Sequence, residues 1–420
     1  MSKLFKTVGW SVGSNVYEVN IRQYTNEGTF EAFKAHLPRL KEMGVGILWF
    51  MPITPISLKE RLGSLGSYYA CSSYVDINPE YGDLNDFKVL VDEAHQLGFK
   101  VIIDWVANHT GWDHEWTIYN PEYYVKDAKG NFTEKNGWRD VIDLNYQSFE
   151  MRQEMINAMR FWVNEFNIDG FRCDMAHLVP LDFWMDARNQ CDSIKDLYWL
   201  AECEDVAYHD VFDTTYSWNF MQTTEKVVKN QASISDLYNI LHGYSQYPEG
   251  CTKLFFTSNH DENSWNGTEY EKYNNLAESF AVFTCTWSRS MPLIYSGQET
   301  ANKHRLSFFD KDEIKWSKKP KLSEFYKSLL VLHKTKSISI GETFILPTNN
   351  SKVISFLRKF EKEVVLVILN LSDDNKIHHQ VHHEWLKGTF YNVFSGLEYS
   401  FNTNEEFELM ANDYMVYQTI

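Results

Sequence analysis

Two kinds of apolar pattern alternate along most of the chain. Over residues 30–43 apolar side chains recur three and four positions apart, and Gly44 follows, which predicts a helix that ends there. The next segment, 45–50, is apolar at nearly every position, as is typical of a strand buried on both faces. The same order returns over 84–97 and 99–104. The pattern therefore predicts helices alternating with buried parallel strands.

The alternation continues along the chain and predicts eight strands separated by helices. The strands cover 16–21, 45–50, 99–104, 168–174, 196–202, 211–216, 253–258 and 291–295. Eight right-handed βα units favour a closed (β/α)8 TIM barrel over a doubly wound sheet. A Gly-rich phosphate loop is missing after the first predicted strand, which also argues against a dinucleotide-binding fold. The predicted fold class is therefore α/β, with a (β/α)8 barrel.

Two regions depart from the alternation. Residues 109–146 have no clear period and lie after the third strand, so we expect a short inserted B domain there. After residue 337 the strand-like runs 353–357, 364–369 and 414–417 are separated by turn residues. The prediction is a catalytic barrel over 1–337, including the insertion, and a C-terminal all-β domain, a β-sandwich, over 338–420.

Composition restricts the partners. The chain has 420 residues with 40 Lys+Arg and 57 Asp+Glu, a net charge of −17. This acidic balance argues against nucleic acid and an anionic membrane surface, because binders of both carry basic patches. Aromatic residues make up 16% of the chain. They indicate either a large core or a flat neutral ligand such as a sugar or a base.

Cysteine usage and the first residues bear on the compartment. The six cysteines are unevenly spaced and form no CxxC, so we expect free buried thiols rather than disulfides or a zinc site. The start of the sequence lacks a continuous apolar leader. The expected location is cytoplasmic, or periplasmic or secreted if a signal peptide has been removed.

Polar residues gather where predicted strands end. Asp104 to His109, Arg172 and Asp174, Glu202, and His260 with Asp261 end four different strands. In a barrel these ends meet at one face, where active sites lie. Several carboxylates with two histidines and one arginine suit glycoside hydrolysis, which uses one carboxylate as nucleophile and one protonated carboxyl as acid.

Arg172 and Asp174 form the most informative pair. They are two residues apart on one strand and therefore share a face. A cation beside Asp174 keeps it ionised, as a nucleophile must be. The alternative is a purely structural Arg–Asp pair.

These segments resemble the conserved regions of glycoside hydrolase family 13, the α-amylase family, in the right order over nearly the whole chain. Six segments carry the resemblance: Asp104-Trp-Val-Ala-Asn108-His109, Gly170-Phe-Arg172-Cys-Asp174, Glu202, Asn259-His260-Asp261, Ile142-Asp143-Leu-Asn145 in the insertion, and the stretch from Ser67-Tyr68-Tyr69 to Gly82.

The resemblance implies a role for each matching residue. Asp174 would be the nucleophile, Glu202 the general acid/base, and Asp261 the residue that holds sugar hydroxyls and stabilises the transition state. Asp104 would support the site from behind. The remaining matches would contact the substrate, and they are Tyr69, His109, Arg172, His177 and His260. No cofactor is implied for the chemistry.

A structural calcium is a further expectation. Asn108 and Asp143 resemble two ligands of the calcium that ties the B domain to the barrel in many amylases. Oxygen ligands of this kind suit Ca²⁺. The alternative is a hydrogen-bonded Asn–Asp pair without metal. Met175, after the nucleophile, and the short insertion depart from common patterns and leave the linkage open.

The expected function is retaining hydrolysis of α-1,4 bonds in starch-derived glucans and maltooligosaccharides. An α-glucan transglycosylase, such as a glucanotransferase or trehalose-forming enzyme, would share every catalytic residue. A non-catalytic glucan-binding barrel is disfavoured because Asp174, Glu202 and Asp261 are all present. Four loop tryptophans are candidate sugar-stacking platforms or loop-packing residues, namely Trp112, Trp116, Trp138 and Trp265.

Overall fold

The eight predicted strands all form, and they close into a parallel barrel. The computed structural model describes residues 4–420. The barrel strands are β1 Val16–Val19, β2 Ile47–Phe50, β3 Lys100–Trp105, β6 Gly170–Cys173, β7 Tyr198–Ala201, β8 Thr214–Tyr216, β9 Thr252–Phe255 and β10 Ser290–Tyr295. Their order around the barrel is β1-β10-β9-β8-β7-β6-β3-β2. The predicted barrel fold is confirmed.

The barrel interior changes from apolar to polar along the strands. Ile47, Ile102 and Leu200 belong to a fully buried apolar cluster inside the barrel. One pleat further along, Asp104 of β3 lies in register with Arg172 of β6. Alternate side chains of a strand share a face. The inward-facing positions of a strand therefore carry apolar residues within the core and charged residues at the carboxyl end of the barrel.

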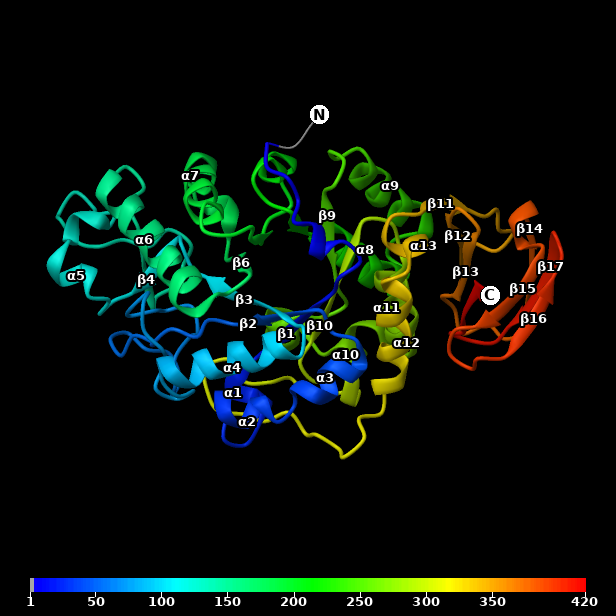
Figure 1. Cartoon of the computed structure of the whole chain (residues 1–420), viewed down its shortest axis with the longest axis horizontal. Coiled ribbons are helices and arrows are strands. Elements are labelled where there is room, and N and C mark those ends of the chain that lie inside the picture. The colour runs from blue at the N-terminus through cyan, green and yellow to red at the C-terminus, as the bar shows by residue number, and fades with distance from the viewer. Residues whose placement is uncertain (1–3) are drawn as a thin grey trace.

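The helices surround this barrel (Figure 1). The larger ones are α3 Leu37–Met43, α4 Leu84–Gln96, α6 Phe149–Phe166, α7 Leu181–Asp192, α8 Trp218–Val228, α9 Ile234–Ser245, α11 Ala277–Thr286 and α12 Ser323–His333. Shorter helices are α1 Ile21–Tyr24, α2 Phe30–Lys34, α5 Trp116–Tyr119, α10 Glu269–Tyr273 and α13 Lys336–Ser339.

The single helix predicted over 30–43 is wrong in one respect. It is divided into α2 and α3 at Ala35 and His36. Pro38 lies in the first turn of α3, where its missing N–H costs nothing, whereas within a continuous helix it would remove a hydrogen bond to Lys34. The proline therefore starts a new helix rather than continuing the old one.

The insertion after β3 is held to the barrel by a short antiparallel ladder. Its strands β4 His109–Gly111 and β5 Val141–Asp143 pair His109 with Asp143. Between them lie α5 and a 3-10 turn, η2 Pro121–Tyr123. The ladder places both ends of the insertion beside the carboxyl end of β3.

The C-terminal region is all-β, as predicted. A six-stranded sheet runs in the order β11-β12-β13-β18-β15-β16, and β14 pairs with β17. Bounds are β11 Glu342–Ile345, β12 Val353–Phe360, β13 Glu363–Asn370, β14 Ile377–His382, β15 Gly388–Asn392, β16 Glu398–Phe401, β17 Asn404–Leu409 and β18 Tyr414–Thr419. Figure 1 shows these strands beside α11–α13, at the opposite end of the molecule from α5. Phe356 packs against Trp287, with ring centroids 5.0 Å apart.

The cysteines form no disulfide within residues 4–420, as expected. All six are buried. Within residues 4–420, no helix has the length and apolar character needed to cross a membrane.

Candidate active site

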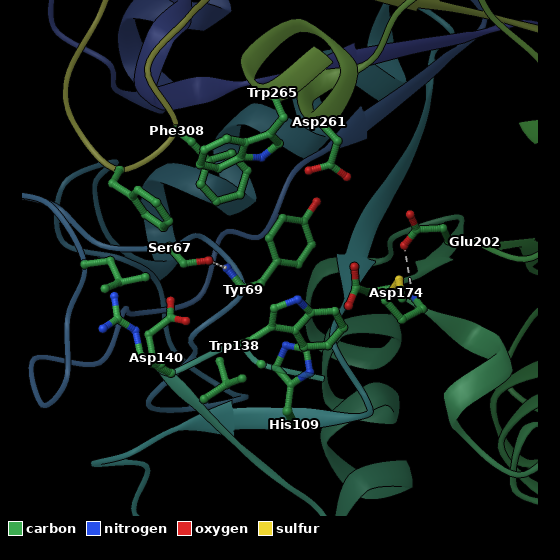
Figure 2. A pocket seen from close by; sticks show the side chains of 16 residues that line it. Ser67, Tyr69, His109, Trp138, Asp140, Asp174, Glu202, Asp261, Trp265 and Phe308 are labelled. Atoms are coloured by element: carbon green, nitrogen blue, oxygen red, sulfur yellow. Dashed lines mark hydrogen bonds between the residues drawn. The ribbon is translucent and has the colours of Figure 1, made fainter. Parts of the chain in front are cut away.

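A cavity of about 410 Å³ lies at the carboxyl ends of the barrel strands. Figure 2 shows the candidate carboxylates Asp174, Glu202 and Asp261 around it. The complete lining is Leu62, Ser67, Tyr69, His109, Gly137, Trp138, Arg139, Asp140, Val141, Asp174, Met175, Glu202, Asp261, Trp265, Phe308 and Phe309. The side chains come from the ends of β6 and β7 and from the loops after β2, β3, β9 and β10, so only the folded chain creates the site.

Arg172 is the centre of the charged cluster. Its guanidinium is fully buried, and Nη1 lies 2.9 Å from both Asp104 Oδ1 and Asp174 Oδ1. Nη2 lies 2.8 Å from Glu202 Oε2. One cation thus contacts three carboxyl groups from three successive barrel strands. The Arg172–Asp174 pair is confirmed as a contact, and it extends to Asp104 and Glu202.

The single positive charge of Arg172 cannot neutralise three buried carboxylates. The pKa values of these carboxyl groups therefore differ from their usual values. Burial raises the pKa of Glu202 to about 7, although Arg172 opposes the shift. Burial likewise raises the pKa of Asp174 to about 6, again against Arg172. Both carboxyl groups therefore keep a proton to higher pH than a solvated carboxyl group does, and Glu202 is the one matched to a general acid.

The contacts of Glu202 and Asp174 indicate which of their carboxyl oxygens remain available to a substrate. Glu202 Oε2 accepts a hydrogen bond from the backbone N–H of Met175 at 2.9 Å, in addition to the Arg172 contact. Asp174 uses Oδ1 for Arg172. Glu202 Oε1 and Asp174 Oδ2 are therefore the atoms left for a substrate. Met175 has a left-handed backbone (φ 39°), an uncommon conformation for a residue with a side chain.

Asp104 and Tyr69 join the cluster to the opposite wall. Asp104 Oδ2 accepts hydrogen bonds from Trp49 Nε1 at 3.1 Å and Tyr69 O–H at 3.2 Å. Tyr69 O–H also lies 2.7 Å from His260 Nε2, and the two rings stack. Asp104 is buried behind the cavity and does not line it. The supporting role expected of Asp104 stays a prediction.

Glu18 is a site residue that the sequence patterns did not reveal. It is fully buried on β1, and its carboxylate pairs with His260 Nδ1. His260 Nε2 in turn lies 3.3 Å from Asp261 Oδ2. Burial alone would lower the pKa of His260, but Asp261 and Glu18 outweigh it and hold that pKa well above the usual value. The one available signal was a lone carboxylate within the apolar run of the first strand.

His109 lines the cavity in its neutral form. Burial lowers its pKa to about 4. Its Nδ1 is 3.1 Å from the side-chain amide nitrogen of Asn108, which donates to it. The neutral ring therefore carries its hydrogen on Nε2 and presents a donor to the cavity.

Comparison with known proteins identifies the family. Residues 14–140 and 120–329 match the family described as "Alpha amylase, catalytic domain", and residues 343–417 match "Maltogenic Amylase, C-terminal domain". The chain belongs to the α-amylase family, glycoside hydrolase family 13. The resemblance seen in the sequence is thereby confirmed.

Two curated relatives within this family align along most of the chain. Alpha-amylase MalA of Haloarcula japonica is 25% identical over 87% of this chain, which spans 56% of that protein. A maltogenic alpha-amylase of Bacillus acidopullulyticus is 24% identical over 93% of this chain, which spans 70% of that protein.

Solved structures of amylases match the chain nearly end to end. A noncanonic maltogenic alpha-amylase, AmyB of Thermotoga neapolitana, has a TM-score of 0.89 and 30% identity, with 97% of this chain and 99% of that one covered. An alpha-amylase of Lactobacillus plantarum also has a TM-score of 0.89, with 28% identity and coverage of 98% and 100%.

Not every predicted residue of this α-amylase family member reaches the cavity. His177 lies in a 3-10 turn, η3 Ala176–Leu178, where its side chain is exposed and does not line the cavity. Of the four tryptophans, Trp138 and Trp265 line it. Trp116 is buried against Tyr74 and Tyr123, so it packs the insertion instead. Trp112 donates to the Arg139 carbonyl oxygen and does not line the cavity.

The predicted calcium ligands lie at the base of the insertion. Within residues 4–420, Asp143 Oδ1 is buried without a hydrogen-bond partner, and the side-chain amide nitrogen of Asn108 donates to His109 Nδ1. A carboxylate oxygen and an amide oxygen are ligands that suit Ca²⁺. Among residues 4–420, however, no group of three or more His, Cys, Asp or Glu side chains could hold a metal. A calcium here would take its remaining ligands from carbonyl groups and water, and this site stays a prediction.

Proposed function

We propose that this protein hydrolyses α-1,4-glucosidic bonds in starch-derived glucans and maltooligosaccharides with retention of configuration. The observation that carries this proposal is the shared Arg172, which holds an ionised Asp174 next to a Glu202 whose pKa is raised to about 7. A nucleophile and a proton donor side by side are what a retaining glycosidase needs.

In the first step, the free Oδ2 of Asp174 attacks the anomeric carbon of the sugar. The bond from that carbon to the leaving oxygen breaks, and Glu202 Oε1 gives its proton to that oxygen. This produces a glycosyl ester on Asp174 and an ionised Glu202. In the second step Glu202 takes a proton from water, whose oxygen attacks the same carbon and releases Asp174.

The other site residues orient the sugar and stabilise its charge. Asp261 is partly exposed to the cavity and ionised: burial raises its pKa, but the neighbouring His260 cation outweighs this and lowers it. It accepts hydrogen bonds from sugar hydroxyls beside the reacting carbon. His109 donates from Nε2, and the ring of Tyr69 forms the wall against which the sugar packs. Asp104 acts indirectly by fixing Arg172 and Tyr69.

The names of relatives support α-glucans as the substrate class. Besides the amylases, they include a cyclomaltodextrinase of a Bacillus species and neopullulanase 2 of Thermoactinomyces vulgaris, 23% and 26% identical over 82% and 80% of this chain. Both names refer to α-linked glucose polymers or rings, as the proposal requires.

A product profile tests the proposal. The purified protein is incubated with maltoheptaose, starch, pullulan, a cyclodextrin and isomaltose, and the products are separated by size. We expect short maltooligosaccharides from maltoheptaose and starch. Larger products than the starting oligosaccharide would indicate transglycosylation, whereas glucose release from isomaltose with starch untouched would contradict α-1,4 action. Binding without turnover of any of them would show a non-catalytic barrel.

A further inference from the structure

Asp140 is a buried carboxylate that the proposed mechanism does not use. It lines the cavity and is 6% exposed. Within residues 4–420 its side chain forms no ion pair and no hydrogen bond with another residue; its own backbone N–H donates to it, and the charges of Glu134 and Arg139 act on it in opposite directions. Burial raises its pKa. An unpaired buried carboxylate is costly for the fold, so its partner is expected to come from outside the chain.

The position of Asp140 decides which part of a glucan it meets. Figure 2 shows Asp140 and Glu202 at opposite sides of the cavity, with Tyr69 between them. Glu202 protonates the leaving oxygen, which is bonded to carbon 1 of the reacting glucose. In an α-1,4 glucan the next sugar on the non-reducing side is attached at oxygen 4, across the ring from carbon 1. The sugar beyond the reacting glucose therefore points toward Asp140.

The walls around Asp140 suit a sugar ring. Trp138, two residues earlier, lines the same cavity. Its loop is held by Glu134, whose carboxylate accepts hydrogen bonds from the backbone N–H groups of Gly137 at 2.6 Å and Trp138 at 2.8 Å. Phe308 contributes a second aromatic side chain to this lining. Flat apolar rings and a carboxylate in one lining provide contacts for both the C–H faces and the hydroxyl groups of a sugar.

Hydrogen bonds between two loops also hold one wall of the cavity in place. The loops after β2 and β10 are joined by Ser64, whose hydroxyl donates to Asp310 Oδ1 at 2.6 Å, and by the N–H of Leu65, which donates to the Phe309 carbonyl oxygen at 2.9 Å. The cavity volume of about 410 Å³ falls within the roughly 300–1,000 Å³ of pockets for drug-sized ligands, and a disaccharide has that size.

We propose that Asp140 binds the second sugar on the non-reducing side of the scissile bond, by accepting hydrogen bonds from that sugar's hydroxyl groups, and so selects maltosyl over glucosyl substrates. This inference rests on the proposed function, since it needs Glu202 as the proton donor to give the site its direction.

The experiment compares two chromogenic substrates in the whole protein. Para-nitrophenyl α-maltoside fills both sugar positions, whereas para-nitrophenyl α-glucoside fills only the reacting one. Asp140→Asn is expected to lower kcat/KM for the maltoside roughly 10- to 100-fold, the range for hydrogen bonds to a charged group, and to leave the glucoside unchanged. Glu115→Gln removes an exposed acidic side chain from the same insertion and is expected to change neither value.

Binding gives the same comparison without turnover. In the Glu202→Gln background, adding Asp140→Asn should weaken maltotriose at least tenfold by calorimetry, with the melting temperature equal or higher because an unpaired buried charge is removed. Equal losses on both chromogenic substrates, or unchanged maltotriose binding, would overturn the inference alone. Absence of wild-type turnover on the maltoside and on starch would instead defeat the proposed function.

Discussion

Glu18 on β1 and His260 after β9 form a buried ion pair across the neighbouring strand β10. The pair links the first strand of the barrel to the face where Asp261 lies, because the other ring nitrogen of His260 faces Asp261 Oδ2 at 3.3 Å. A carboxylate on each side keeps the imidazole charged and fixes its orientation. We therefore expect Glu18 to be a positioning residue, which acts on the sugar site through His260.

Replacing Glu18 by Gln tests this relationship. The amide can still accept a hydrogen bond from His260, but the negative charge is lost, so the pKa of His260 should fall. We expect kcat/KM to drop roughly tenfold, as for loss of a charge-assisted hydrogen bond. Proton NMR titration of His260 gives a readout that a merely structural role would not move. Glu269→Gln, at another buried carboxylate outside the cavity, is the control and should leave the titration unchanged.

Glu202→Gln should abolish turnover of unactivated glucans while leaving binding nearly intact. The amide keeps an acceptor for the Met175 N–H but has no proton to give. Loss of general acid catalysis costs roughly 10²–10⁴-fold. Substrates with a good leaving group need less proton transfer and should lose less. Wild-type rates on starch would rule out Glu202 as the acid.

The dependence of activity on pH should be bell-shaped, with its maximum between the two raised pKa values. Asp174 must be ionised, so activity should fall as the pH drops through about 6. Glu202 must be protonated, so activity should also fall as the pH rises through about 7. Initial rates of kcat/KM in a series of buffers measure both limbs. A profile that keeps rising into alkaline pH would contradict the assignment of Glu202.

The anomer formed first should be α. Attack by Asp174 inverts carbon 1 and attack by water inverts it again, so an α-glucan yields an α-product. Proton NMR of freshly formed maltooligosaccharides, recorded before mutarotation, distinguishes the two outcomes. An initial β-anomer would mean that water attacks directly, and the ester on Asp174 would then be wrong.

Calcium, if bound by Asn108 and Asp143, should raise the melting temperature as its concentration rises, because ligands of the folded state stabilise it by mass action. Asp143→Asn should weaken this response, whereas Asp127→Asn, in an exposed turn of the same insertion, should preserve it. Elemental analysis of the purified protein gives an independent measure. Identical melting curves with calcium and with excess chelator, and no metal found, would remove the site.

Several features could be predicted from local sequence patterns. Runs such as 45–50 and 99–104 are apolar on both faces, which is possible only for strands covered on both sides, and eight of them predict the barrel. Asp104, Arg172, Asp174 and Glu202 follow such runs directly, so the register of each strand already places them at its carboxyl end. A local pattern can also mislead. The apolar period over 30–43 is continuous, but Pro38 divides this segment into two helices.

Only the tertiary structure decided which of these groups touch and what charge they carry. Closure of the barrel brings three carboxyl groups to the single cation of Arg172, and burial then raises the pKa of Glu202 above that of Asp174. Glu18 and His260 are 242 positions apart in the sequence, and no period connects them. The sequence does not distinguish Asp140 from the other acidic residues, and only folding buries it in the lining of the cavity. Sequence periodicity reports which side of an element is buried, whereas distances and dielectric environment depend on how distant elements pack, and these set the chemistry.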